Sequence, residues 1–276
     1  MNSYDEILQS VHECQKLLNT NNLSLFYRGH ADKDWKLVPT ISRETYSGVS
    51  EKSIIDTAIK RKKWQLNRSL FENVAYLQHY GSPTRFLDYS TDVDIALFFA
   101  CCSHEDKDGV ISVCTYTNDR GTYSFDSTLI AELALLENKT SMQEFCLILM
   151  SKYPELKDVY SSWWERLGMD IIVWLDHGFM VVPSDDEYVK LKEWNKRLFN
   201  QKGTFFVFGN KTEKPIAGAS TIEARNCIIL PELATTPNII NHRDYAKKIP
   251  VRKEAKAEIL DILAQKGISN TYIYPD

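Results

Sequence analysis

The sequence predicts an α+β fold in which short strands from distant segments form sheets that pack against helices. Three observations predict it: apolar residues recur at helical spacing in several segments, short apolar runs such as 109–116 (GVISVCTY) are typical of buried strands, and no regular strand–helix–strand repeat is present. With 276 residues, of which 43% are hydrophobic and 25% charged, the chain can bury a full core.

Periodicity and capping residues place the expected helices after Ser3, from 50 to about 78 as one helix or two in series, from Asp92 to 100 with Thr91 or Asp92 as N-cap, and at 185–199 and 252–266. Gly81 and Pro83 would end the helical region 50–78, and Gly267 would cap the helix at 252–266. Strands are expected at 23–27, 109–116, 204–208, 226–230 (closed by Pro231) and 271–274. A less regular, helical insertion at about 117–186 interrupts what is otherwise a single domain covering 1–276.

Composition excludes several general classes of protein. The net charge of -4 gives no overall attraction to nucleic acid or to an anionic membrane. The first residues, MNSYDEILQS, do not read as a signal peptide, and no apolar run is long enough for a membrane span. A cytoplasmic protein without a membrane partner is therefore expected. The six cysteines are scattered and form no C-x-x-C pair, so we expect reduced core residues.

The first motif is FYRGH at 26–30. Arg28 would end a strand, and Gly29 would turn the backbone where a ligand can approach closely. The planar guanidinium suits a phosphate or a carboxylate. Alternatively, Arg28 pairs with a buried acid such as Asp88.

The second motif reads as one tight polar turn followed by the apolar helix from Ile95. Asp92 and Asp94 already satisfy the dipole of that helix, so its N-terminus is not expected to be a strong anion site. A turn that only fixes register is the alternative. The side chains expected to line a cleft are His79, Tyr80, Thr84, Arg85, Asp88 and Ser90.

The third motif joins Arg197 and Gln201, four residues apart on one face of a helix end, to Gly203, which releases the chain into a strand. Taken alone it indicates a helix C-cap. The usual phosphate-binding glycine motifs and the G-x-S-x-G nucleophile motif do not occur. Residues 60–63 (KRKK) and Arg68 form a basic stripe, for which a solvated face is the default and contact with RNA or DNA the alternative.

Together and in this order, the three motifs resemble the FRG domain family. The Phe-Arg-Gly signature of that family stands here as Phe26-Tyr27-Arg28-Gly29, with one residue inserted or substituted. Its second block is similar to 79–90, with Phe86 in a leucine position, and its third block to Arg197, Gln201, Gly203 and Phe205. Leu263, Gly267, Ile268 and the final YPD also echo the family, so the resemblance runs from Leu23 to the last residue.

The layout of the FRG family is similar to that of the ADP-ribosyltransferase superfamily. This resemblance implies an ADP-ribosyltransferase-like core and an NAD-dependent enzyme that acts on an unknown acceptor, protein or nucleic acid, as an intracellular toxin or phage defence effector. Arg28 would hold the phosphates and the nicotinamide ribose, Ser90 and Thr91 would support the nicotinamide pocket, and Tyr80 or Tyr89 would stack on the ring. The implied NAD-binding set also includes Gly29, His79, Thr84, Arg85, Asp88 and Arg197.

The sequence departs from the superfamily at one position. Gln201 stands where a glutamate is expected, and an amide cannot take a proton. The implied catalytic set is therefore Arg28, Gln201 and, as a substitute carboxylate, Glu223. Without a carboxylate, the protein would be a non-catalytic module that binds a nucleotide or nucleic acid. A third alternative is a buried hydrogen-bonded network that only specifies the fold.

Overall fold

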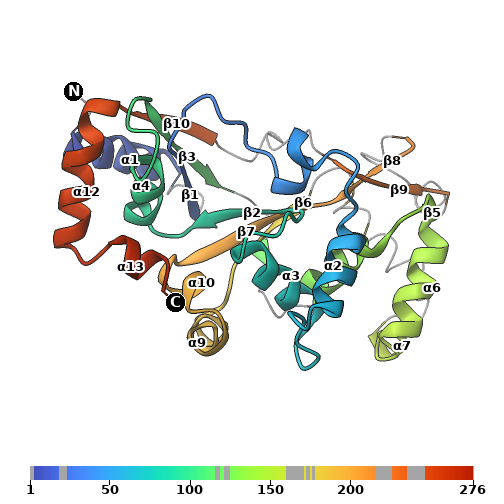
Figure 1. Ribbon diagram of the computed structural model, residues 1–276. Helices are drawn as coiled ribbons and strands as arrows, with labels where there is room; N and C mark the ends of the chain where they lie inside the picture. The colour runs from blue at the N-terminus through green and yellow to red at the C-terminus, as the bar shows by residue number, and fades with distance from the viewer. Residues whose placement is uncertain are drawn as a thin grey trace.

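The computed structural model describes residues 3–18, 24–115, 119–120, 125–159, 171, 175, 178–214, 226–234 and 246–275. Within them the chain has the predicted α+β fold, with two sheets and helices packed around them (Figure 1). In this part of the chain, no helix is both long enough and apolar enough to cross a membrane.

The larger sheet has seven strands in the described residues, in the order β10-β3-β1-β2-β7-β6-β4. Adjacent strands are antiparallel, except that β4 joins β6 in parallel at the edge. The strands are β1 Leu25–His30, β2 Phe86–Ser90, β3 Gly109–Thr115, β4 Asp119–Arg120, β6 Gly178–Val181, β7 Gly203–Phe208 and β10 Ala246–Val251. The smaller sheet has the order β5-β9-β8, with β5 Thr140–Ser141, β8 Asn210–Thr212 and β9 Ile228–Leu233.

The helices form groups along the sheets (Figure 1). At one end, α1 Tyr4–Leu18, α4 Val93–Cys101 and α12 Lys256–Gln265 pack beside β1, β3 and β10, whereas α6 Met142–Lys152 and α7 Leu156–Val159 lie at the end of the small sheet. The remaining helices are α2 Glu51–Lys60, α3 Leu70–His79, α5 Phe125–Glu132, α9 Asp185–Trp194, α10 Lys196–Asn200 and α13 Asn270–Ile273. Single 3-10 turns occur at Thr40–Ser42, Glu44–Tyr46, Leu133–Leu135 and Lys253–Ala255.

Side-chain alternation along β2 explains how one strand serves two cores. Phe86 packs with α3, α5 and β7 on one face, and Leu87 and Tyr89 pack with Phe206 on the other. This period of two is what a strand imposes. β2 pairs with β7 over its whole length but with β1 only at Tyr27↔Ser90. β1 and β2 therefore diverge next to Asp88, and this divergence makes room for a site.

Gly29 lies inside β1, not at a turn beyond the strand. A Cβ at this position would stand 1.8 Å from the carbonyl oxygen of Ala96 and 2.7 Å from the backbone nitrogen of Ala100. The glycine therefore allows α4 to pack directly on β1. The prediction that the backbone turns at Gly29 is therefore wrong, and α4 occupies the space that the missing side chain leaves.

Several predicted elements are confirmed, among them the helix after Ser3, the strands β3 and β7, and α4 with Asp92 as its N-cap. The region from 50 to about 78 forms two helices, because loop 61–69 separates α2 from α3. The predicted helix at 185–199 breaks at Asn195, whose side chain accepts a hydrogen bond from the backbone nitrogen of Leu198 and so begins α10. The helix at 252–266 is confirmed as a 3-10 turn followed by α12, with Gly267 at φ +85°.

Four predictions on the fold are corrected. The supposed tight turn contains strand β2, because Phe86, Leu87 and Tyr89 are buried between neighbouring layers. The supposed strand at 271–274 is helix α13, capped by Ser269, whose hydroxyl accepts from the backbone nitrogen of Tyr272. Pro231 does not end β9, which continues to Leu233. The pairing of β9 with β8 is irregular at this point, so the missing N–H of the proline is tolerated. Of the six free cysteines, five are buried, but Cys102 is exposed.

The predicted insertion at about 117–186 contains α5, α6 and α7. β4 and β6 from the same range belong to the large sheet, so part of this segment completes the main architecture. Trp163 and Trp164 lie outside the described residues.

Candidate functional site

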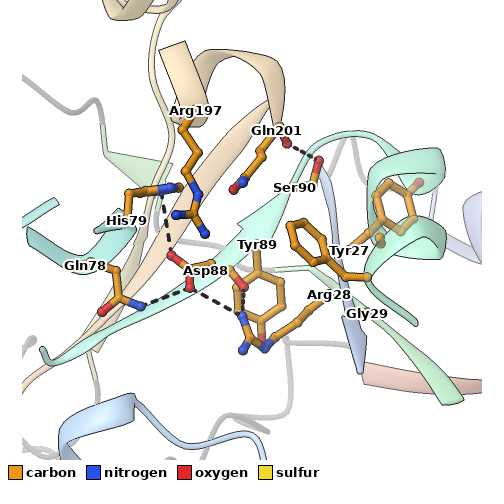
Figure 2. Close-up of a pocket in the computed structure, with 12 residues that line it drawn as sticks. Tyr27, Arg28, Gly29, Gln78, His79, Asp88, Tyr89, Ser90, Arg197 and Gln201 are labelled. Carbon is orange, nitrogen blue, oxygen red and sulfur yellow. Dashed lines mark hydrogen bonds and ion pairs between the residues drawn. The ribbon is translucent and has the colours of Figure 1, made fainter. Parts of the chain in front are cut away.

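A pocket of about 140 Å³ lies where β1 and β2 diverge, beside the last turn of α3, helix α4 and helix α10 (Figure 2). Segments far apart in the sequence meet there: the Arg28 strand, the stretch around His79 and Asp88, and the short helix that carries Arg197. The lining residues are Tyr27, Arg28, Gly29, Gln78, His79, Asp88, Tyr89, Ser90, Ala96, Phe99, Arg197 and Gln201.

Asp88 is the carboxylate of this pocket. Its Oδ2 accepts a hydrogen bond of 2.9 Å from Gln78 Nε2, and Gln78 Oε1 in turn accepts one of 2.7 Å from the hydroxyl of Thr84. Asp88 Oδ2 also lies 3.8 Å from Arg28 Nη1, and Asp88 Oδ1 lies 3.8 Å from His79 Nε2. This bracing sets the orientation of a side chain that is still 38% exposed, so Asp88 can act on a ligand.

Arg28 is held from both sides within the sheet. Its Nη1 donates to the carbonyl oxygen of Asp88, which the divergence of β1 from β2 leaves without a strand partner, and its Nε donates to His30 Nε2 at 2.9 Å. Burial lowers the pKa of Arg28 from its usual value, and the charge of Asp88 opposes this shift. Burial, together with the charge of Arg28, lowers the pKa of His30 to about 3, so His30 is neutral and can accept.

His79 and Arg197 bring further polar atoms to the pocket. The His79 side chain is 3% exposed, and burial lowers its pKa to about 4, although the charge of Asp88 favours protonation. Seven buried side-chain polar atoms have no hydrogen-bond partner in the described residues, and three of them belong to residues that line this pocket: His79 Nε2, Asp88 Oδ1 and Arg197 Nε. Since buried polar groups are nearly always paired, three such atoms around one pocket indicate a place for a polar ligand or ordered water.

The C-terminal segment supports the side of the pocket formed by α10. Gln201 Nε2 donates to the carbonyl oxygen of Ile273 at 3.2 Å, and the Arg197 guanidinium stacks on the ring of Tyr274 with its central carbon 4.5 Å from the centroid. Tyr274 also meets Phe99 edge-on, with 6.3 Å between centroids. Ser90 ties β2 to the same region, because its hydroxyl donates to the carbonyl oxygen of Gln201 at 2.8 Å.

The structure brings together many of the residues that the sequence predicted for a site. Those that line the pocket are Arg28, Gly29, His79, Asp88, Tyr89, Ser90, Arg197 and Gln201. Tyr80, Thr84, Arg85 and Thr91 do not line it. Tyr80 and Thr91 are exposed, and Thr84 acts only through Gln78. Glu223 lies outside the described residues.

Arg85 belongs to a separate buried network. Its Nε and Nη2 both lie 2.7 Å from Glu51 Oε2, and its Nη1 donates to the carbonyl oxygen of Phe208 and to Asn210 Oδ1. The guanidinium donors are therefore engaged by Glu51, Phe208 and Asn210. For Arg85, the alternative of a network that specifies the fold is the better description.

Four lining residues had no predicted role at the site: Tyr27, Gln78, Ala96 and Phe99. Two of them carried a signal in the sequence, since Tyr27 lies inside the FYRGH motif and Gln78 precedes His79. Ala96 and Phe99 belong to the apolar helix α4, for which the sequence predicted no part in a site.

Comparison with known families identifies an FRG domain over residues 23–109. The matched segment runs from just before β1 to the first residue of β3 and holds the Arg28 and Asp88 parts of the pocket, but not Arg197 or Gln201. No curated protein and no solved structure matches the chain significantly.

Proposed function

We propose that the pocket binds the nicotinamide end of NAD and that the protein is an NAD-consuming enzyme of the ADP-ribosyltransferase kind. The observation that carries this proposal is that three buried atoms of the pocket make no hydrogen bond within the described residues. Arg197 Nε donates, Asp88 Oδ1 accepts, and His79 Nε2 accepts when the proton sits on the other ring nitrogen. A primary carboxamide, with one carbonyl oxygen and two N–H groups, complements this set.

The size and the walls of the pocket fit a single ring. A cavity of about 150 Å³ holds a benzene-sized molecule, and this one measures about 140 Å³. Phe99 supplies aromatic surface against which a flat ring can pack, whereas the ring of Tyr89 packs with Phe206 on the opposite face of β2. The ribose and the phosphates of NAD would lie outside, near Arg28, whose Nη2 makes no hydrogen bond in the described part of the chain.

The chemistry proposed for this site is cleavage of the bond between the nicotinamide nitrogen and C1′ of the ribose. The bonding electrons leave with nicotinamide, and positive charge develops on the sugar. Asp88, fixed by Gln78, would stabilise that charge at short range. An acceptor or a water molecule then bonds to C1′ and loses its proton to solvent, since Gln201 cannot take it. Asp88 thus takes the role that the superfamily gives to a glutamate at position 201.

The test is release of nicotinamide from NAD by the purified protein, with binding measured by isothermal titration. Asp88→Asn keeps the shape but removes the charge and should lower turnover at least about 100-fold, the typical effect of removing one electrostatic contact to a transition state. Arg28→Lys keeps the charge but loses the planar fork, and should weaken NAD binding. Lys139→Ala, which removes only an exposed ion pair with Glu213, is the control. Folded wild-type protein that does not bind NAD would overturn the proposal.

An enzyme of this kind in the cytoplasm would deplete NAD or modify a macromolecule, as an intracellular toxin or a phage defence effector does. Induced expression should then slow growth and lower cellular NAD, and Asp88→Asn should abolish both effects at equal protein level. Growth arrest that persists with Asp88→Asn would argue against toxicity through this pocket.

A second candidate function is a non-catalytic module that binds nucleic acid. The observation in its favour is that residues 60–63, all cationic, are exposed and make no ion pair within the described chain. It predicts salt-sensitive binding of nucleic acid in the absence of any NAD turnover.

A further inference from the structure

Loop 61–69, between α2 and α3, together with the last residue of α2, presents an unusual concentration of positive charge. Lys60, Arg61, Lys62 and Lys63 are consecutive and exposed. The acids nearest to them in the sequence are already engaged: Asp56 pairs with Lys52 at 2.8 Å, and Glu72 accepts from the backbone nitrogen of Ser69. These cations are therefore available to a partner that carries negative charge.

A row of stacked side chains begins in the same loop and continues along α3. The Arg68 guanidinium lies over Trp194, with its central carbon 4.8 Å from the ring centroid, and 5.8 Å from the centroid of Tyr76. Tyr76 in turn stacks on Tyr80, with 4.4 Å between centroids and 31° between planes. Tyr80 ends the row and is 54% exposed. Its ring can take one more planar group.

The row leads from the basic loop toward the pocket. α3 has 10 residues, so it is about 15 Å long at 1.5 Å per residue. Its first turn adjoins loop 61–69, and its last two residues, Gln78 and His79, line the pocket. Tyr80 comes directly after them. A ligand that contacts both the basic loop and Tyr80 therefore reaches the neighbourhood of the pocket.

We propose that residues 60–63, Arg68, Tyr76 and Tyr80, which we name the basic–aromatic surface, bind single-stranded nucleic acid and that this nucleic acid is the acceptor. The cations would contact backbone phosphates, and an unpaired base would stack on Tyr80. The charge of the whole chain is -4, so binding depends on this local surface.

Single-stranded nucleic acid fits this surface better than the other anionic partners. An acidic peptide would use the lysines but would leave the stacked, exposed tyrosine without a role. A membrane surface would require a larger apolar patch, whereas the large aliphatic side chains exposed beside these cations are Ile59 and Leu66. A DNA or RNA duplex keeps its bases stacked inside and cannot place one on Tyr80.

The acceptor role rests on the proposed function, whereas binding does not. In the transfer, a nucleophilic nitrogen or oxygen of a base or sugar bonds to C1′ of the ribose. The bond from C1′ to nicotinamide breaks, nicotinamide leaves with the electron pair, and the proton of the nucleophile goes to solvent. The nucleic acid gains one ADP-ribose for each nicotinamide released.

Binding is tested by fluorescence anisotropy with labelled single-stranded DNA and RNA oligonucleotides, without NAD. The surface has five cations, residues 60–63 and Arg68, and each would contact one phosphate. The logarithm of the affinity should then fall with the logarithm of the salt concentration at a slope of about -3.5. Lys62→Ala combined with Lys63→Ala should reduce that slope by about 1.4. Tyr80→Ala should weaken binding about 5- to 160-fold, whereas Tyr80→Phe, which keeps the ring, should bind like wild type. Lys139→Ala is again the control.

Three outcomes would overturn the proposal that the basic–aromatic surface binds single-stranded nucleic acid. They are no binding of either oligonucleotide, equal binding by Tyr80→Ala and wild type, or tighter binding of the matched duplex, of polyglutamate or of phosphatidylserine vesicles. Transfer is tested with radiolabelled NAD and the bound oligonucleotide. Label that stays out of the oligonucleotide while nicotinamide is released overturns the acceptor role and leaves the proposed function intact. Oligonucleotide binding without any NAD consumption overturns the proposed function and supports the surface.

Discussion

Replacing Arg85 is expected to destabilise the fold rather than to weaken ligand binding in the pocket. Arg85 and Glu51 side chains are 1% and 7% exposed, respectively, and Glu51 accepts from the backbone nitrogen of Arg85 at 2.6 Å as well as from its guanidinium. Arg85→Ala leaves the Glu51 carboxylate buried without a cation, which typically lowers the free energy of unfolding by about 3–5 kcal/mol. For a chain of this size, that corresponds to a melting temperature lower by roughly 10 °C.

The assay is chemical unfolding followed by fluorescence and circular dichroism, combined with a double-mutant cycle. Arg85→Met with Glu51→Leu removes both charges, so the double variant should be less destabilised than Arg85→Met alone. Arg85→Lys, which keeps the charge but not the fork, should lose stability yet retain ligand binding while folded.

Two results would refute the assignment of Arg85 to the core. The first is a loss of less than about 1 kcal/mol for Arg85→Ala, which is the range of an exposed ion pair. The second is a folded Arg85→Lys protein whose affinity for NAD or for nicotinamide has fallen tenfold or more. Such a fall would return Arg85 to the binding set that the sequence predicted.

The structure supports two further predictions. Gly29→Ala places a methyl group 1.8 Å from the carbonyl oxygen of Ala96 and must displace α4, so it should lower the free energy of unfolding by more than about 2 kcal/mol. Gly48→Ala, at φ +81° but with open space around it, should cost only the roughly 1–2 kcal/mol of a left-handed backbone. Equal melting temperatures for the two variants would contradict the packing of α4 on Gly29. The pKa of His79 is about 4 in the folded protein, against 6.5 for the unfolded chain, so the unfolded chain binds more protons between these values. The stability that the protein has above pH 6.5 should therefore be lost as the pH falls toward 4, by at most about 3 kcal/mol. His79→Asn should reduce, but not abolish, the change of the unfolding free energy with pH between 7 and 4, because the pKa of His30 is lowered as well. An unchanged slope would show that His79 is not buried in neutral form.

Part of the site could be predicted from the sequence because its residues occur in motifs with a recognisable order. Arg28, Asp88, Arg197 and Gln201 were expected to meet, and they do. Arg85, only three residues from Asp88, was expected beside it and lies elsewhere, because its partner Glu51 is 34 residues away in the chain. No local pattern reports that separation, and a strand in this region, unlike a turn, sends neighbouring side chains to opposite faces.

Local patterns were sufficient for the α+β class, for α4 with its acidic cap and for β3, since periodicity and capping depend on residues a few positions apart. They also carried the resemblance to the FRG domain, which the comparison confirms over residues 23–109. The tertiary structure decided which polar groups are satisfied by the protein and which are left for a ligand. The gap between β1 and β2, the packing of α4 on Gly29 and the unpaired atoms of His79, Asp88 and Arg197 arise from contacts between distant segments. Burial and hydrogen bonding belong to the assembled fold, so they could not be read from the order of residues alone.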